Sequence, residues 1–113
     1  MTPAPRIVYS AVVRNTAARP VKLRVTYAMP NGPNEEEHVR VAPGERVKLN
    51  QRLVHQGSAV LSSHIQRILI EGEVHRESMF EAPFEGVTSP VKNYAMEVAQ
   101  ESGVLKLRRA LLR

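Results

Sequence analysis

The 113-residue chain has a formal net charge of +5 at pH 7, and 42% of its residues are hydrophobic, with no tryptophan and only five phenylalanines and tyrosines. It contains no cysteine, and all eleven acidic residues are glutamates. These absences exclude disulfide scaffolds, thiolate nucleophiles, cysteine-bound metal sites, and aspartate-based triads, dyads and EF-hand calcium loops. A chain of this length is expected to form one domain, residues 1–113, around one aliphatic core.

The N-terminal segment "MTPAPRIVYSAVV" lacks the apolar run of a secretory signal. Nothing further along the chain approaches the roughly 18 consecutive apolar residues of a membrane span. We therefore expect a soluble, intracellular and cytoplasmic protein.

The first half of the chain predicts strands separated by short turns. Ile7 to Val13 is the first predicted strand, and the following "RNTAARP" is typical of a turn. Residues 21–27 alternate strictly between apolar and polar side chains, which predicts a strand with one buried face. A loop is expected from Met29 to Asn34 because it contains two prolines and a glycine. The pattern "VRVAPGERVKL", residues 39–49, predicts a β-hairpin closed at Pro43-Gly44.

The segment that follows is ambiguous, and the strands then resume. Residues 55–64 fit either a loop with Val60 and Leu61 tucked inward or a single helical turn. Ile65 to His75 is the next predicted strand, with Ile68, Ile70 and Val74 on its buried face. Gly72 on that face indicates a bulge or a close packing neighbour.

A long connection rich in proline and glycine leads to the last two predicted elements. Tyr94, Met96 and Val98 share one face of a strand, and "QESG" is typical of a turn. The C-terminal element, residues 104–113, is predicted as a strand to about Leu107, although its apolar spacing also suits an amphipathic helix. Seven or eight short strands without a convincing long helix predict an all-β protein, a single antiparallel β-sandwich, with a small closed barrel as the alternative.

The layout of the first fifty residues resembles known sandwiches. The runs "VVRNTAARPVKLRVTYAMPNG" and "EEHVRVAPGERVKLN" are similar to the strand, turn and strand arrangement of immunoglobulin-like and prealbumin-like domains. The spacing of Asn15, Val21, Leu23, Gly32 and Pro43-Gly44 resembles the β-domain of the von Hippel–Lindau family, a substrate-recognition module. The tryptophans of that family are absent here, as is the Cys-Trp-Cys pattern of true immunoglobulin domains. The resemblance implies a sandwich and carries over no catalytic residue.

Charge is distributed unevenly along the chain. Residues 1–70 contain ten Lys and Arg against four Glu, residues 71–101 contain two against seven, and residues 102–113 contain four against none. Opposite charges that face each other across a sheet stabilise it. We therefore expect the acidic segment to lie beside basic strands that neutralise it, with a basic patch for an acidic partner as the alternative.

Three groups of residues are candidate sites. Glu71, Glu73 and His75 suggest an acid or metal site, but alternation along one strand is enough to place them together on its solvent face. The Phe80 to Gly86 loop contains both phenylalanines of the chain, Phe80 and Phe84, with Pro83 between them. These residues either anchor a partner or fold back to cover the core. The third group consists of the C-terminal cations Lys106, Arg108, Arg109 and Arg113, candidates for polyanion binding.

The sequence favours a non-catalytic binding or adaptor module that acts through protein–protein interaction. No Gly-x-Ser-x-Gly elbow is present, and the four histidines lack ligand spacing, so we predict no catalytic residue, no cofactor and no metal. The expected partner is another protein, bound at an exposed strand edge or at the Phe80 to Gly86 loop. Homodimerisation through strand edges is an open possibility. The alternatives are RNA or polyanion binding, and an enzyme that uses Glu71, Glu73 and His75.

Overall fold

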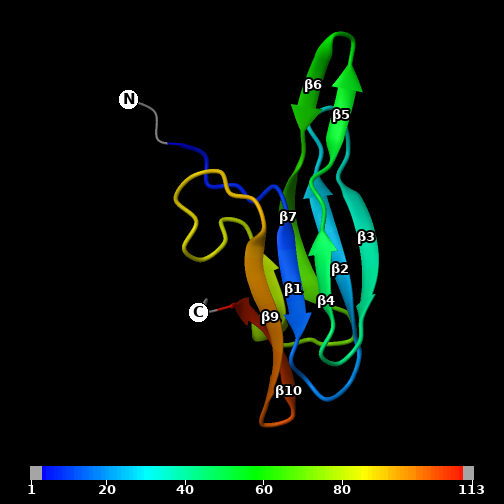
Figure 1. Ribbon diagram of the computed structural model, residues 1–113, viewed down its shortest axis with the longest axis vertical. Helices are drawn as coiled ribbons and strands as arrows, with labels where there is room; N and C mark the ends of the chain where they lie inside the picture. The colour runs from blue at the N-terminus through cyan, green and yellow to red at the C-terminus, as the bar shows by residue number, and fades with distance from the viewer. Residues whose placement is uncertain (1–3, 111–113) are drawn as a thin grey trace.

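Two four-stranded β-sheets pack face to face in the computed structural model, which describes residues 4–110 (Figure 1). The first sheet has the order β10-β9-β1-β4, where the strands are β1 (Ala11–Asn15), β4 (Arg46–Leu49), β9 (Tyr94–Glu101) and β10 (Val104–Arg109). The second has the order β3-β2-β7-β8, where the strands are β2 (Val21–Ala28), β3 (Glu35–Val41), β7 (His64–Ile70) and β8 (Met79–Glu81). The predicted all-β sandwich is confirmed.

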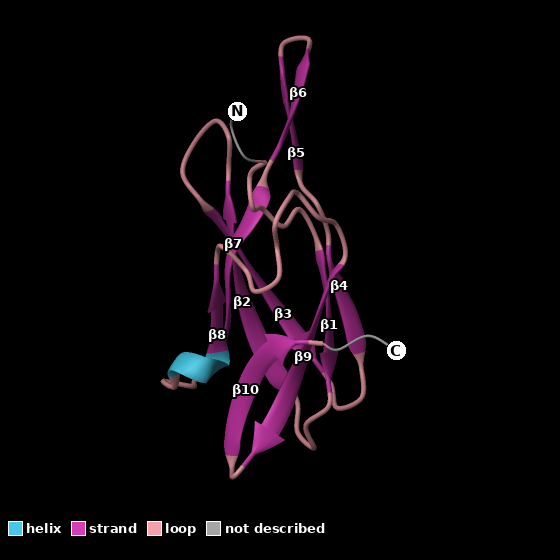
Figure 2. Ribbon diagram, turned by 90° about the vertical axis from the view of Figure 1, so that its left-hand side faces the viewer, coloured by secondary structure: helices cyan, strands magenta, loops and turns pink. Residues whose placement is uncertain are grey.

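A third, smaller sheet extends beyond the sandwich. It is the hairpin formed by β5 (Leu53–Gln56) and β6 (Ala59–Ser62), and Figure 2 shows it standing clear of the two main sheets. The only helical element in residues 4–110 is a 3₁₀ turn, η1 (Arg76–Ser78), which precedes β8. The structure thus has ten strands rather than the seven or eight expected, and none of the three sheets closes on itself, so the barrel alternative is wrong.

The core lies between the two main sheets and is almost entirely aliphatic. The inward positions predicted for residues 21–27 and for Tyr94, Met96 and Val98 are all buried. The largest side chains with less than 2% exposure are those of Tyr27, Leu23, Leu49, Ile65, Ile68, Ile70, Met96, Val8, Val13, Val25, Val41 and Val98. Because the core draws on both sheets, neither sheet buries its apolar face without the other.

The prediction of a hairpin over residues 39–49 is wrong. β3 pairs with β2 in the second sheet, whereas β4 pairs with β1 in the first. The Pro43-Gly44 turn, where Gly44 has a φ of +79°, therefore carries the chain across the core instead of reversing it within one sheet. Val41 and Leu49 are both buried, but they reach the core from opposite sides. Alternation identifies a buried face and does not identify the strand that pairs with it.

The sandwich also departs from pure antiparallel pairing. β1 pairs in parallel with β9, with Val13 opposite Met96, because the chain visits the second sheet and the hairpin before it returns beside β1. The predicted Ile7 to Val13 strand begins later, at Ala11, although Val8 makes isolated bridges to Ile65 and Val91. The C-terminal element is a strand, Val104–Arg109, paired throughout with β9, so the helical alternative is wrong for the described residues.

Three predictions about residues 55–75 are also wrong. Residues 55–64 contain most of the β5–β6 hairpin and are neither a loop nor a helical turn. β7 ends at Ile70, and Val74 is 94% exposed rather than inward-facing. Gly72 adopts a φ of +86° in the turn after β7, and no atom lies within 4 Å of the place a Cβ would occupy. It is a turn residue and marks neither a bulge nor a close packing neighbour.

A fully buried amide, the side chain of Asn15, joins two of the connections by which the chain crosses between the sheets. Asn15 lies at the end of β1 and is 0% exposed. Its Nδ2 donates to the carbonyl oxygens of Arg19 (2.9 Å) and Val41 (3.0 Å), and its Oδ1 accepts from the Ala17 amide (2.9 Å). The first and last of these bonds shape the β1–β2 crossing, and the second reaches the start of the β3–β4 crossing.

The backbone of Asn15 makes further bonds to the β3–β4 crossing. Its amide donates to the Glu45 carbonyl (2.9 Å), and its carbonyl accepts from the Gly44 amide (2.7 Å). The β1–β2 and β3–β4 crossings are therefore both held by one residue through five hydrogen bonds, and the bonds between its side chain and Val41 and Ala17 are buried.

We predict that Asn15→Ala lowers the free energy of unfolding by roughly 3 to 5 kcal/mol, because it leaves two carbonyl oxygens and one amide without their buried partner. Urea unfolding followed by circular dichroism measures the loss. The matched control is Asn34→Ala, since Asn34 is exposed and makes one side-chain bond, to Gln66. A loss below 1 kcal/mol for Asn15→Ala, or equal losses for both variants, would contradict this role.

Candidate functional site

The β5–β6 hairpin is the most exposed ordered element of the described chain. Its turn consists of Gly57 and Ser58, and Gly57 has a φ of +61°. Glycine at the first central position of a two-residue turn fits the type II′ geometry, which matches the twist of paired strands. The pairs run from Gln56 opposite Ala59 at the tip to Leu53 opposite Ser62 at the base. A short glycine-containing turn thus builds a regular hairpin in a segment whose apolar content predicted burial.

Both faces of the hairpin carry aliphatic side chains. Leu53 and Val60 lie on one face and are 55% and 56% exposed. Val54 and Leu61, paired with each other, lie on the opposite face and are half-buried. A two-stranded hairpin without a further layer is only marginally stable in water. Exposure of these aliphatic groups to water therefore destabilises the isolated protein, and contact with another surface would remove this unfavourable term.

The edges of the hairpin lack the charges that protect the other sheet edges. β3, β4, β8 and β10, which border the two main sheets, all contain glutamate, lysine or arginine (EEEHVRV, RVKL, MFE and VLKLRR). β5 (LVHQ) and β6 (AVLS) contain no lysine, arginine, glutamate or proline. Charge and proline on an edge strand are the usual devices that prevent another chain from pairing with it. Among the strands of residues 4–110 that border a sheet, these two alone are left open to pairing.

Arg52 fastens the base of the hairpin to the second sheet. Its guanidinium lies over the Tyr27 ring, 4.3 Å from the centroid. The same group forms ion pairs with Glu35 (2.9 Å) and Glu37 (3.3 Å) of β3. A guanidinium that stacks on an aromatic face while it pairs with carboxylates is held in one position.

Hydrogen bonds made by Gln51, Ser62 and Ser63 fix the other side of the hairpin base. Ser63 is fully buried, and both its amide (3.0 Å) and its hydroxyl (3.1 Å) donate to the Arg52 carbonyl. The Gln51 side chain donates to the Ser62 hydroxyl at 2.7 Å. The base is therefore anchored by side chains and backbone together, whereas the tip beyond it makes only the contacts of its own two strands.

Burial under Arg52 changes the acidity of Tyr27. Desolvation, with a smaller contribution from the nearby Glu37 carboxylate, raises the pKa of Tyr27 from 10 to about 12. The Tyr27 hydroxyl also donates to Glu37 at 3.2 Å. The ring is 0% exposed and closes the end of the core on which the hairpin stands.

The Phe80 to Gly86 loop packs onto the core. Phe84 is 3% exposed, and its ring contacts those of Phe80 and Tyr94 edge to face, with centroid distances of 5.6 Å in both pairs. Of the predicted anchor residues, Pro83 is exposed, Phe80 is half-buried, and Phe84 is a core residue. Phe84 is therefore not available as a partner anchor, because these scarce aromatic rings are used to cover the aliphatic core.

The C-terminal cations are largely neutralised. Arg108 pairs with Glu97 and Glu101, each at 2.7 Å, and Lys106 pairs with Glu101 at 3.1 Å. The expected neutralisation between the acidic segment and its basic neighbours is confirmed by these pairs and by Arg19 with Glu73. The sequence indicated the neutralisation but not the individual pairs, because the acids that pair with Lys106 and Arg108 belong to the neighbouring strand β9.

Of the other two predicted cations, only Arg109 lies among the described residues, and it makes a different contact. The Arg109 guanidinium lies 6.0 Å from the centroid of the Tyr94 ring, and it occupies the space a side chain at Gly86 would need. Arg113 lies outside the described residues. The three described cations therefore make separate contacts, Lys106 and Arg108 with glutamates and Arg109 with Tyr94.

The candidate acid site does not assemble. Glu71 is hydrogen-bonded to His38 of β3, which lowers the pKa of that carboxyl. Glu73 pairs instead with Arg19 at 3.8 Å, and His75 is exposed next to η1. The three residues separate because β7 ends at Ile70, so they do not share one strand face. Within residues 4–110, no three histidines or glutamates are grouped in a way that could hold a metal ion.

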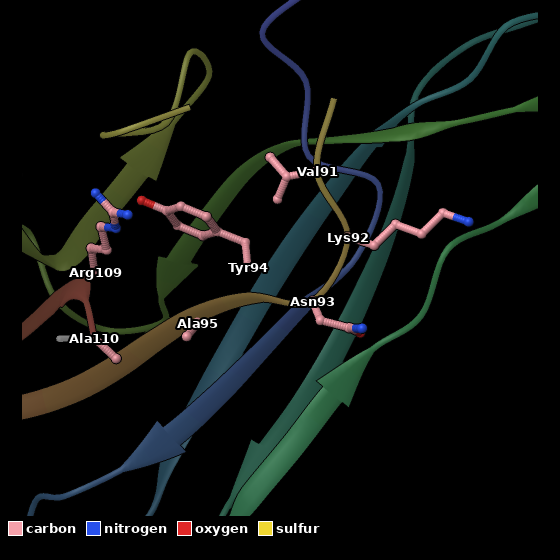
Figure 3. Close-up of a pocket in the computed structure, with 7 residues that line it drawn as sticks. All are labelled: Val91, Lys92, Asn93, Tyr94, Ala95, Arg109 and Ala110. Atoms are coloured by element: carbon pink, nitrogen blue, oxygen red, sulfur yellow. The ribbon is translucent and has the colours of Figure 1, made fainter. Parts of the chain in front are cut away.

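One hollow of about 430 Å³ opens beside the start of β9. Its lining comprises Val91, Lys92, Asn93, Tyr94, Ala95, Arg109 and Ala110. Figure 3 shows the two cations of this set pointing to opposite sides, so no pair of charged groups converges on a common point. The Tyr94 hydroxyl is already bonded to the Glu85 carbonyl. The hollow thus lacks the converging polar groups typical of a small-molecule site.

Comparisons with known proteins provide no functional information. The chain matches no protein-family model, no curated protein and no solved structure. Among the described residues, no helix is both long and apolar enough to cross a membrane.

The raised pKa of Tyr27 predicts a specific loss of stability at alkaline pH. Below pH 10 the tyrosine is protonated whether the chain is folded or unfolded, and its contribution is fully present. Between pH 10 and about 12 the unfolded chain loses this proton first, so the wild type loses on the order of 2 to 3 kcal/mol. Tyr27→Phe should remove this part of the pH dependence.

Urea unfolding at pH 7 and at pH 11.5 tests this prediction. At pH 7, Tyr27→Phe should cost only about 1 kcal/mol, the value of one hydrogen bond to Glu37. The gap between the variant and the wild type should then narrow or reverse at pH 11.5. Parallel pH dependence in the two proteins would show that Tyr27 is not the buried titrating group.

Proposed function

We propose that the protein is a non-catalytic binding module that captures an extended segment of another protein by adding it as a strand to the β5–β6 hairpin. The observation that carries this proposal is the absence of lysine, arginine, glutamate and proline from two free strand edges that also bear exposed aliphatic side chains. Strand addition obtains affinity from main-chain hydrogen bonds and specificity from alternate side chains. The hairpin offers both kinds of contact.

The geometry of the hairpin identifies which backbone groups are free. In a hairpin with a two-residue turn, the pair next to the turn is hydrogen-bonded, which here is Gln56 with Ala59. The next pair, His55 with Val60, therefore directs its amide and carbonyl groups outward, one set on each edge. Leu53 and Ser62 do the same at the base. Each edge thus offers two residues whose main-chain groups can bond to an added strand.

The surrounding charge favours a neutral or acidic segment as the partner. The chain contains no glutamate between Glu45 and Glu71. The cations nearest to the hairpin in sequence are Arg52, Lys48 and Arg67, and Arg52 is already paired with β3. Complementary charge accelerates association and disfavours partners of the same sign.

The size of the site favours reversible binding. Each free edge is four residues long, so an added strand would bury less area than a standard protein–protein interface. A contact of this size is typical of transient recognition. The anchored base at Arg52 and Ser63 supports this role, because a strand template held in place loses less conformational entropy on binding.

Selection of displayed peptides on the folded protein, followed by fluorescence anisotropy with the selected peptides, tests the proposal. We predict that Val60→Lys weakens binding at least tenfold, because it puts a charge on the open edge, while the stability changes by less than about 0.5 kcal/mol. Val74→Lys is the matched control, since Val74 is even more exposed but lies on the turn after β7. It should bind as the wild type does.

Proline variants separate the two edges. His55→Pro removes an outward amide on β5, and Val60→Pro removes one on β6, so the variant that abolishes binding identifies the edge used. Selected peptides that bind both proline variants as tightly as the wild type would disprove the proposal. Binding that collapses between 50 and 200 mM salt would instead support the polyanion alternative.

A further inference from the structure

Three buried polar atoms on the outer face of the second sheet have no hydrogen-bond partner. They are Arg24 Nε, Thr26 Oγ1 and Arg67 Nε. Arg24 and Thr26 are two residues apart on β2 and so share a face, and Arg67 lies directly opposite Thr26 on β7. Unpartnered polar atoms are uncommon in folded proteins, and three at adjacent positions on one sheet face indicate that a ligand or ion completes them.

Thr26 distinguishes this group from an ordinary charged surface. The residue faces outward, yet it is only 5% exposed, so its hydroxyl is neither solvated nor bonded. A buried hydroxyl without a partner costs stability, and valine would fill the same volume without that cost. The hydroxyl therefore has no structural benefit in the isolated protein, which points to a contact that forms only with a ligand.

Arg24 and Arg67 have glutamates near them, Glu71 and Glu81, but are not paired with either. Among the described residues, no ion pair within 4.0 Å involves Arg24 or Arg67. The nearby Glu71 is bonded to His38 instead. Other arginines of the chain, such as Arg52 and Arg108, each pair with two glutamates. Two half-buried guanidinium groups side by side repel each other unless an anion lies between them.

We propose that Arg24, Thr26 and Arg67 bind a single tetrahedral oxyanion, namely a phosphate group. Two guanidinium groups and a hydroxyl supply only donors when they contact an anion, and the planar guanidinium fork matches the spacing of phosphate oxygens. Lys22, on the same face of β2 and exposed, adds positive charge at the margin.

The neighbouring residues limit the site to one phosphate group. Glu36 lies opposite Thr26 on β3, and Glu81 lies opposite Arg67 on β8. The register therefore places a carboxylate at each end of the row that contains Thr26 and Arg67. A single phosphate group fits between these acids, whereas a nucleic-acid strand crossing the sheet would be repelled at both ends. The site is also separate from the hairpin, which belongs to another sheet.

Titration with inorganic phosphate at pH 7.5, followed by amide chemical shifts at constant ionic strength, tests this site. We predict saturable shifts in β2 and β7 at millimolar phosphate for the wild type. Arg67→Gln should abolish saturation. Thr26→Val should weaken binding about tenfold and still unfold at the same or a higher temperature than the wild type. Weaker phosphate binding without a lower unfolding temperature would show that Thr26 contacts the ligand and does not stabilise the fold.

The control variants and ligands make each outcome decisive. Arg14→Gln removes an exposed arginine from the first sheet and should leave phosphate binding unchanged, as should Val60→Lys in the hairpin. O-Phosphoserine binding more tightly than phosphate would support a phosphorylated side chain as the source, and binding of inorganic phosphate alone would support the free ion. Equal shifts with acetate or chloride, or equal losses in Arg14→Gln and Arg67→Gln, would overturn the proposal.

Discussion

The fold depends on one buried amide. Asn15 bonds to both the β1–β2 and the β3–β4 connection between the sheets, and its side chain is 0% exposed. Without these bonds, the alternating strands on either side could pair within one sheet, as residues 39–49 suggest they should. A polar group at the core therefore selects this connectivity over a simpler one, while the aliphatic side chains supply most of the favourable free energy.

The same connectivity produces the candidate site. Because β4 lies in the first sheet and β7 in the second, the chain between them has to span the open end of the core. It does so by closing that end with Arg52 over Tyr27 and by extending outward as a hairpin. The hairpin is thus part of the connection between β4 and β7, and its base is anchored at Arg52 and Ser63. This anchoring explains how so small an element keeps a defined position.

Much of the fold could be predicted from the sequence, but the connectivity could not. The period-two pattern of residues 21–27 and the inward set at Tyr94, Met96 and Val98 identified buried faces correctly. The predicted pairing of residues 39–49 was wrong because the alternation of apolar and polar residues is the same whether a strand returns beside its predecessor or crosses to the other sheet. The prediction for residues 55–64 was wrong because apolar side chains were taken to indicate burial, whereas Val60 is exposed. The role of Asn15 was hidden because asparagine before a proline-containing segment usually indicates a solvated turn.

The shortness of the open edges has a consequence for the protein in a crowded cell. An aliphatic strand edge without charges can pair with another copy of itself as readily as with a partner. Stacked fibrils typically begin from segments of six or seven residues. β5 and β6 have four residues each, and Gly57 interrupts the run between them. Each strand of the hairpin is thus shorter than the segments from which fibrils typically form. We therefore expect a mutation that lengthened either strand to promote self-association before it improved recognition of a partner.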